Sequence, residues 1–492
     1  MRRCGILMPI FSLPSRYGIG TFSKEAYDFV DFLKASGQSL WQILPLGPTG
    51  YGDSPYQSFS TFAGNPYFID VDEFVKEGFI KEADCKKYAS RETGDIDYAD
   101  LYNKRFKLLK KAYEKSNIET VKGYKAFCKE NAFWLDDYAL FMALKDERGG
   151  RPWTEWEKDL KLRKPASVTA AKKRLDKEIG FYKFQQFYFA KQWKALKKYA
   201  NDGGVEIVGD IPIYVAFDSA DVWANPGLFD LNEENIPNAV AGCPPDPFAP
   251  TGQLWGNPLY RWDVHKETGY AWWIKRIAFC FDLYDVVRID HFRGFDAYYA
   301  IPYEDTTAER GKWRKGPGYD LFKAINAALG EKQIIAEDLG FLTDSVRRLV
   351  KRTGYPGMKI MQFAFGSGAD NEYLPHNLSA NSVIYTGTHD NETVRGWYER
   401  NLTDDKKCAE YTRFYAREED PSKMAWALIE LCYKSVCDTA IIPMQDFLNL
   451  GGEGRINTPA VLGGNWQWRM KKNACTKALA KKIDKLRKLC LR

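Results

Sequence analysis

The sequence predicts an α/β protein, a (β/α)8 barrel of the TIM type with a largely helical insertion after the second strand. Three observations favour this fold. Eight short apolar segments recur along the 492 residues, each ends at polar, glycine or proline residues, and helical patterns separate them. The alternative is an open doubly wound sheet. No expected strand is followed by a glycine-rich phosphate-binding motif, so this alternative gains no support.

The first two expected strands lie near the N-terminus, at residues 4–11 and 39–46. Residues 23–37 between them have the spacing of an amphipathic helix, with a serine cap and a glycine stop. Pro9 and Pro14 interrupt the first apolar run, which indicates a strand rather than a signal peptide. Six more strands are expected after the insertion, at residues 205–212, 285–290, 333–340, 358–365, 382–390 and 439–446.

Residues 71–198 interrupt the alternation of strands and helices. They are rich in lysine, glutamate and aromatic residues and read as mostly helical. We expect them to form an insertion on a single catalytic barrel that spans residues 1–492. The tail, residues 469–492, carries ten Lys or Arg and an apolar stripe at helical spacing. It predicts a basic C-terminal helix on the barrel surface, with a membrane or anion contact as the alternative.

The composition limits the class of protein. Hydrophobic residues make up 45% and charged residues 28%, which is typical of a soluble globular protein. The excess of 71 Lys+Arg over 65 Asp+Glu is too dilute to indicate a nucleic-acid partner, and no segment is long enough to suggest a membrane-spanning helix. The ten cysteines are scattered without a C-x2-C pair, which argues against zinc and disulfides and favours a cytoplasmic protein.

Acidic residues close four of the expected strands. Asp210 closes the third strand, Asp290 the fourth, Glu337 the fifth and Asp390 the seventh. Active sites of (β/α)8 barrels lie at the carboxyl ends of the strands, so these acids should line one cleft. For Asp210 alone, a helix cap or an ion pair remains the favoured interpretation. The sequence offers no dense set of His and Asp residues suited to a metal, so we expect none.

Two carboxylates, one ionised and one protonated, are the apparatus of glycoside cleavage. Strand alternation places Arg288 and Asp290 on one face, so the arginine should keep Asp290 ionised as a nucleophile; an internal ion pair fits this segment equally well. Glu337 follows an apolar run that should raise its pKa and suit it to general acid and base catalysis, with Asp338 as the competing candidate. Asp390 could stabilise a positively charged transition state.

Longer motifs point to a family. The chain contains, in this order, VRIDHFRG, IAEDLG and TGTHDNET, at residues 287–294, 335–340 and 386–393. These motifs resemble those of the amylomaltase family of 4-α-glucanotransferases, and the resemblance covers almost the whole chain. Other segments that carry it are SLPSRYGIG, DSPYQSFSTFAGNP, GDIPIYV, GQLWGNP and PMQDFL. The resemblance implies a retaining enzyme without a cofactor that acts on malto-oligosaccharides and on starch or glycogen-type α-glucans.

The resemblance also implies roles for individual residues. Asp290 matches the family nucleophile, Glu337 the general acid and base, and Asp390 the transition-state stabiliser. Asp246 and Trp255 fall in a mobile loop, residues 242–258, that is expected to cover the substrate. The full set of expected substrate-binding residues is Tyr56, Asp210, Asp246, Trp255, Arg288, His291, His389 and Asn391, and Tyr51 matches an aromatic of a second glucan-binding groove.

Two other functions compete with glucan transfer. An α-1,4-glucan hydrolase could use the same acids, and an inactive glucan-binding protein could keep the aromatic residues; the complete set of acids argues against the second. The sequence departs from the usual family pattern at Cys4 and at residues 457–466. Neither departure is expected to touch the proposed chemistry.

Overall fold

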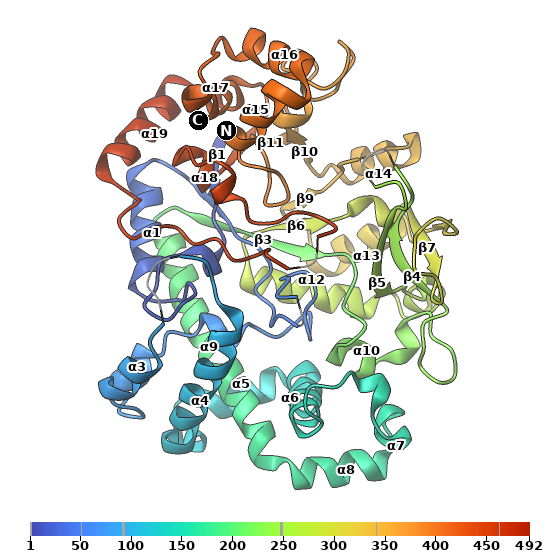
Figure 1. Cartoon of the computed structure of the whole chain (residues 1–492). Helices are drawn as coiled ribbons and strands as arrows, with labels where there is room; N and C mark the ends of the chain where they lie inside the picture. Colours follow the sequence, from blue (N-terminus) through green and yellow to red (C-terminus); the bar gives the residue numbers. More distant parts are fainter. Residues whose placement is uncertain (1, 51, 91–93, 247–248, 341, 462) are drawn as a thin grey trace.

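The computed structural model describes residues 2–50, 52–90, 94–246, 249–340, 342–461 and 463–492. Its centre is a closed barrel of eight parallel strands (Figure 1), which confirms the predicted fold class. Each expected strand overlaps one barrel strand. Around the barrel their order is β1 (Arg3–Leu7), β12 (Thr439–Pro443), β11 (Ser382–Tyr385), β10 (Gly357–Ile360), β9 (Ile334–Ala336), β6 (Val286–Asp290), β3 (Glu206–Pro212) and β2 (Leu40–Gln42).

Alternate residues of these strands fill the barrel interior. One buried cluster takes two apolar side chains from each of β10 and β11 and one from each of the other six strands. Its members are Leu7, Leu40, Val208, Val286, Ile335, Met358, Ile360, Val383, Tyr385 and Ile441. Side chains two positions further along a strand point to the same face. Val208 and Val286 are therefore followed on the inner face by Asp210 and Arg288, which lie above this apolar layer at the carboxyl end of the barrel.

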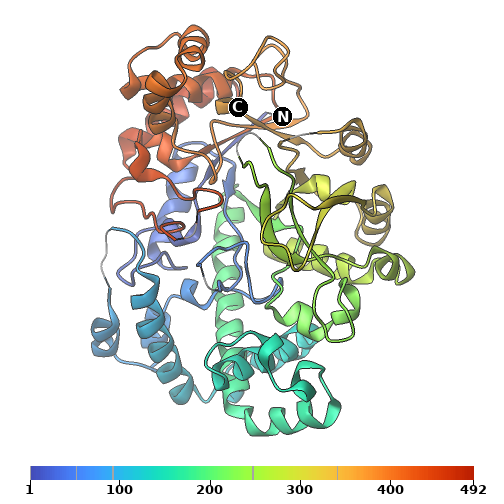
Figure 2. The ribbon, with the colours of Figure 1, turned by 45° about the vertical axis from the view of Figure 1, so that its right-hand side comes forward.

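Helices surround the barrel (Figures 1 and 2). The first, α1, begins after Ser23 and ends before Gly37, whose φ of 68° suits a helix stop. Its position agrees with the amphipathic helix expected between the first two strands. Ser23 stands at the N-cap position, but its hydroxyl group donates to the Glu25 carboxylate and makes no capping hydrogen bond. The helices outside the insertion are α1 (Lys24–Ala35), α10 (Ala220–Ala224), α11 (Trp262–Glu267), α12 (Ala271–Leu283), α13 (Tyr319–Leu329), α14 (Asp344–Thr353), α15 (Val394–Asp404), α16 (Lys406–Ala416), α17 (Pro421–Lys434), α18 (Met444–Phe447) and α19 (Lys477–Leu489).

The described part of the segment between β2 and β3 contains eight α-helices. The long helix α9 packs on α6 within this segment and also on α1 and β3, so it joins the helical segment to the barrel. Figure 2 shows α4 to α8 gathered at the end of the molecule away from α15 and α16. These helices are α2 (Asp72–Lys76), α3 (Glu82–Tyr88), α4 (Tyr98–Ser116), α5 (Tyr124–Glu130), α6 (Ala132–Glu147), α7 (Lys158–Lys161), α8 (Pro165–Arg174) and α9 (Asp176–Asp202).

A second sheet was not predicted from the sequence. It is antiparallel, with the strand order β5 (Gln253–Pro258), β4 (Ala239–Cys243), β7 (Ala297–Pro302) and β8 (Lys312–Lys315). Strands β4 and β5 form the two ends of the range 242–258 that was expected to be a loop. Pairing of β4 with β7 joins segments that are far apart in sequence, and local periodicity does not reveal such pairing.

The C-terminal helix is shorter than expected. Helix α19 begins only at Lys477, so residues 469–476 precede it. Thr476 is its N-cap residue, and the Thr476 side chain accepts a hydrogen bond from the Leu479 N–H. Ala480 and Ile483 are buried where α19 packs on α1 and α17. Among the described residues, no helix combines the length and the apolar character needed to cross a membrane.

Candidate active site

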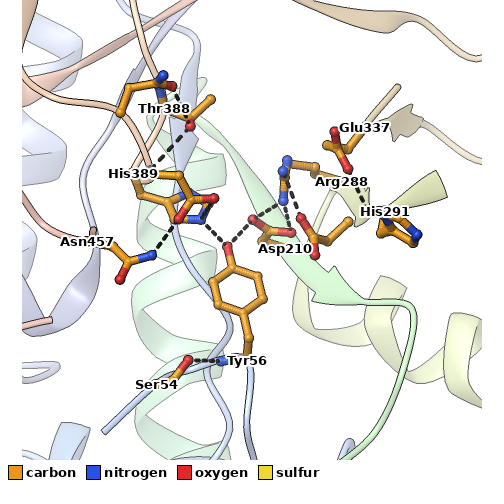
Figure 3. A network of polar contacts seen from close by, with 12 residues as sticks. Ser54, Tyr56, Asp210, Arg288, His291, Glu337, Thr388, His389 and Asn457 are labelled. Atoms are coloured by element: carbon orange, nitrogen blue, oxygen red, sulfur yellow. Dashed lines mark hydrogen bonds and ion pairs between the residues drawn. The ribbon is translucent and has the colours of Figure 1, made fainter. Parts of the chain in front are cut away.

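Neighbouring strands bring charged side chains to one end of the barrel (Figure 3). Strands β3, β6 and β9 are adjacent, and Asp210 of β3 is in register with Arg288 of β6. Asp290 ends β6, Glu337 directly follows β9, and Asp390 lies a few residues after β11. The parallel strands therefore gather acids that are far apart in sequence.

Arg288 lies at the centre of this site, with its side chain 3% exposed. Its Nη1 donates to the two carboxylate oxygens of Asp210 at 2.8 and 2.7 Å, and its Nη2 lies 3.0 Å from Oδ1 of Asp290. Asp210 is completely buried, whereas the side chain of Asp290 remains 30% exposed. Asp210 therefore forms the ion pair that was favoured for this residue taken alone, and it orients Arg288 from below. Its expected role in substrate binding stays a prediction.

Glu337 is held by two backbone amides. Its Oε2 accepts a hydrogen bond from the His291 N–H at 2.7 Å, and its Oε1 accepts one from the Leu339 N–H at 2.9 Å. The competing candidate, Asp338, instead accepts a hydrogen bond from the Met358 N–H of β10 at 2.7 Å. Strand alternation thus separates the two acids, and Asp338 has a structural partner in the barrel wall.

Tyr56 connects the two sides of the site (Figure 3). Its hydroxyl group donates to Oδ2 of Asp210 at 2.8 Å and lies 2.9 Å from Nε2 of His389. The same Nε2 atom lies 3.3 Å from Oδ2 of Asp390. A continuous chain of polar contacts therefore runs from Asp290 through Arg288 to Asp390.

Burial raises the pKa of both candidate catalytic acids. The pKa of Glu337 rises to about 7, first because of burial and then because of the negative charge of Asp290. Burial also raises the pKa of Asp290 to about 6, while the Arg288 cation opposes this rise. Arg288 pairs directly with Asp290, whereas the donors to Glu337 within the described part of the chain are backbone amides, so the proton is held preferentially by Glu337.

Asp390 shows the opposite shift. Burial disfavours its charge, but the adjacent His389 outweighs burial and holds the pKa of this carboxyl group below its ordinary range. Burial likewise disfavours a charged His389. The effect of the Asp390 carboxylate is larger than that of burial, so the pKa of the His389 imidazole is raised. The two residues therefore favour an anion beside a cation.

Comparisons with known proteins show the family of this chain. A family model described as 4-alpha-glucanotransferase matches residues 8–476. A 4-alpha-glucanotransferase of Clostridium butyricum is 50% identical over 98% of this chain and 99% of its own, and one of Thermus thermophilus is 48% identical over 95% of each. The chain belongs to the 4-alpha-glucanotransferase family. This confirms the family predicted from the motifs.

Solved structures of this family support the fold. An amylomaltase from Streptococcus agalactiae in complex with acarbose is 42% identical and has a TM-score of 0.96 over the whole of both chains. An amylomaltase from Corynebacterium glutamicum has a TM-score of 0.78 at 18% identity, over 99% of this chain and 74% of its own, which supports the fold alone.

Aromatic rings line the site of this family member. The Trp255 ring on β5 meets His291 edge to face, with centroids 4.8 Å apart. Tyr56 stacks on His389 with centroids 5.2 Å apart, and the Trp466 ring lies 5.9 Å from Tyr56. Flat apolar surfaces beside carboxylates are suited to sugar rings, which present apolar faces and polar edges.

The other expected site residues lie at the edge of this arrangement. Asn391 accepts hydrogen bonds at Oδ1 from the N–H and hydroxyl groups of Thr388, which closes the turn after β11. Asp246 is exposed between β4 and β5, where its Oδ1 accepts a hydrogen bond from the Ala249 N–H. Tyr51 lies outside the described residues.

Residues 457–466 were expected not to touch the chemistry, and that expectation was wrong. The Asn457 amide donates to Oδ1 of Asp390 at 2.6 Å, and Trp466 packs near Tyr56 and His389. Neither residue ends a strand, so strand alternation gave no signal for them. Their place in the site depends on how the segment after α18 folds back over the barrel.

One group of possible metal donors occurs among the described residues, and it is remote from the strand ends. Donor atoms of Asp72, Glu82 and Cys85, in α2 and α3, lie within 4.8 Å of one another. Arg16 donates hydrogen bonds to both carboxylates. The Arg16 cation already neutralises this group of donors. The group takes no part in the site described above.

Proposed function

We propose that this member of the 4-alpha-glucanotransferase family transfers α-1,4-glucan segments by a retaining double displacement. In the first step, Asp290 attacks the anomeric carbon while Glu337 gives its proton to the leaving glycosidic oxygen. The C–O bond breaks, a covalent glucosyl-enzyme forms and the shortened chain leaves. Asp390, held as an anion by His389 and Asn457, stabilises the positive charge that develops on the sugar.

The second step returns the enzyme to its starting state. Glu337, now ionised, removes the proton from the 4-hydroxyl group of an acceptor glucan. That oxygen attacks the anomeric carbon, the bond to Asp290 breaks, and the configuration is retained overall. Transfer exceeds hydrolysis when the acceptor is bound and water is excluded. We assign that role to the segment 242–258, acting as a mobile cover that carries Trp255, and to the aromatic walls.

The observation that supports this division of roles best is the unequal environment of the two acids. Asp290 has a cation 3.0 Å away, and Glu337 has two neutral amide donors and lies near the Asp290 charge. One acid is thereby suited to attack and the other to hold a proton at the same pH.

Incubation with maltotriose tests the proposed reaction. We expect glucose and longer malto-oligosaccharides to appear together while the total number of reducing ends stays constant, because each bond broken is replaced by a new one. Chromatography of the products and a reducing-end assay on the same samples measure this. A rise in reducing ends equal to the glucose released would instead identify a hydrolase.

The pH dependence of kcat/KM is expected to be bell-shaped. Activity rises with pH as Asp290 loses its proton near its raised pKa of about 6, and falls as Glu337 loses its proton near about 7. Because the acids interact, the two midpoints belong to the pair. Initial rates with maltotriose across this range measure both limbs. Asp338→Asn is the matched control and should leave the alkaline limb in place; loss of that limb would contradict the assignment of Glu337.

We place this reaction in the cytoplasm. All ten cysteines are free, and seven of them are buried, which suits a reducing compartment. We also retain the proposal of a second glucan-binding groove around Tyr51.

A further inference from the structure

A small cavity lies against His389, on the wall formed by the turn after β11 and the segment after β12. Its volume is about 10 Å³, and its lining includes His389, Gln445, Asp446 and Arg455. A polar cavity of this size has room for about one water molecule. None of the catalytic steps described above uses this space.

Two polar atoms of the lining residues lack partners among the described residues. They are Nδ1 of His389 and Oε1 of Gln445, and each belongs to a side chain less than 5% exposed. The Gln445 Nε2 group donates to the Gly454 carbonyl at 3.2 Å, which identifies Oε1 as the free acceptor of the amide. A buried polar atom left without a hydrogen bond is costly, so both atoms indicate a small polar ligand.

We propose that this cavity holds one ordered water molecule, which accepts a hydrogen bond from Nδ1–H of His389 and donates one to Oε1 of Gln445. Nε2 of His389 faces the Asp390 carboxylate and Tyr56 and must carry a proton to bind the carboxylate. A second proton on Nδ1 makes the ring an imidazolium. Gln445 is then a positioning residue that stabilises this cation through the water.

The charges around His389 favour this state. Asp390 and Asp210 stabilise the cation, whereas burial and Arg288 oppose it. The two carboxylates on the cavity side have other partners. Asp446 accepts hydrogen bonds from Thr386 and Val394, and Glu392 accepts one from the Thr393 N–H and pairs with Arg455 at 3.5 Å. The bridging water therefore supplies the hydrogen bond that the Nδ1–H group needs.

This inference rests on the proposed function only for its catalytic meaning, namely that a cationic His389 keeps Asp390 ionised. The site itself is tested without turnover. The chain contains four histidines, so selective ¹⁵N labelling of histidine gives four imidazole spin systems, and the set missing from His389→Asn identifies His389. We expect both His389 nitrogens to be protonated at neutral pH. An unprotonated Nδ1 would overturn the proposal.

Two substitutions at Gln445 should move the His389 titration in opposite directions. Gln445→Met removes the acceptor and should lower the midpoint by about one pH unit, as expected for losing a hydrogen bond to a buried charge. Gln445→Glu places a carboxylate near the water and should raise the midpoint. A loss of packing alone would not reverse the sign.

Gln362→Met is the matched control. Gln362 is also buried, and its Nε2 donates to one backbone carbonyl, that of Glu392, but it does not line the cavity. Equal shifts in Gln362→Met and Gln445→Met would overturn the proposal. A protein that hydrolysed maltotriose or failed to act on it would contradict the proposed function, and these NMR results would still stand on their own.

Discussion

Replacing Asp290 with asparagine abolishes transfer, with kcat/KM reduced by at least about 10⁴-fold, because the amide cannot form the glucosyl-enzyme. The protein remains folded. Burial raises the pKa of the Asp290 carboxyl group from 3.8 to about 6. The contribution of this group to the free energy of unfolding therefore falls as the pH rises between these two values, and it remains unfavourable at higher pH. A neutral asparagine removes this unfavourable charge, and Arg288 keeps both contacts with Asp210. We therefore expect a Tm at neutral pH no lower than that of the wild type.

Rates of maltotriose disproportionation and thermal unfolding of the same samples test this prediction. Asp296→Asn is a suitable control, because Asp296 lies six residues further on and its carboxylate accepts a hydrogen bond from the Ser345 hydroxyl group. Its activity should be close to that of the wild type. If Asp290→Asn turned over glucan at a near-normal rate, the nucleophile would have to be another residue.

The parts of the site that the sequence predicts are those that obey strand periodicity. Arg288 and Asp290 share a face because they are two residues apart on β6, and the same alternation separates Glu337 from Asp338. Each of these residues ends or follows an apolar strand that is recognisable by itself. Local spacing is therefore enough to place them at the carboxyl end of the barrel.

The remaining parts depend on contacts between distant segments. Asn457 reaches Asp390 only because the chain after α18 folds back over the barrel, and β4 becomes a strand only by pairing with β7. The burial of Asp210 also follows from its neighbours, since Arg288 and Tyr56 take its oxygens. None of these features leaves a repeating pattern in the sequence.

Replacing Glu337 with glutamine removes the proton donor and leaves the nucleophile intact. With glucan substrates we expect kcat/KM to fall by about 10² to 10⁴-fold, the usual contribution of general acid and base catalysis. The glutamine side chain keeps one carbonyl acceptor for the two amides that hold Glu337, and a neutral group at this buried position leaves the fold intact. The alkaline limb of the pH profile should disappear together with the activity.

A donor whose leaving group needs no proton separates this role from a general loss of structure. With α-maltosyl fluoride, the first step of Glu337→Gln should proceed at near wild-type rates, measured as a burst of fluoride. The maltosyl-enzyme should then accumulate, because no base activates the acceptor. Mass spectrometry of the trapped protein would locate the sugar on Asp290. Asp338→Asn, the control at the neighbouring carboxylate, should transfer from both donors. If the fluoride did not restore the first step, Glu337 would be acting on something other than the leaving group, and its raised pKa would reflect burial alone.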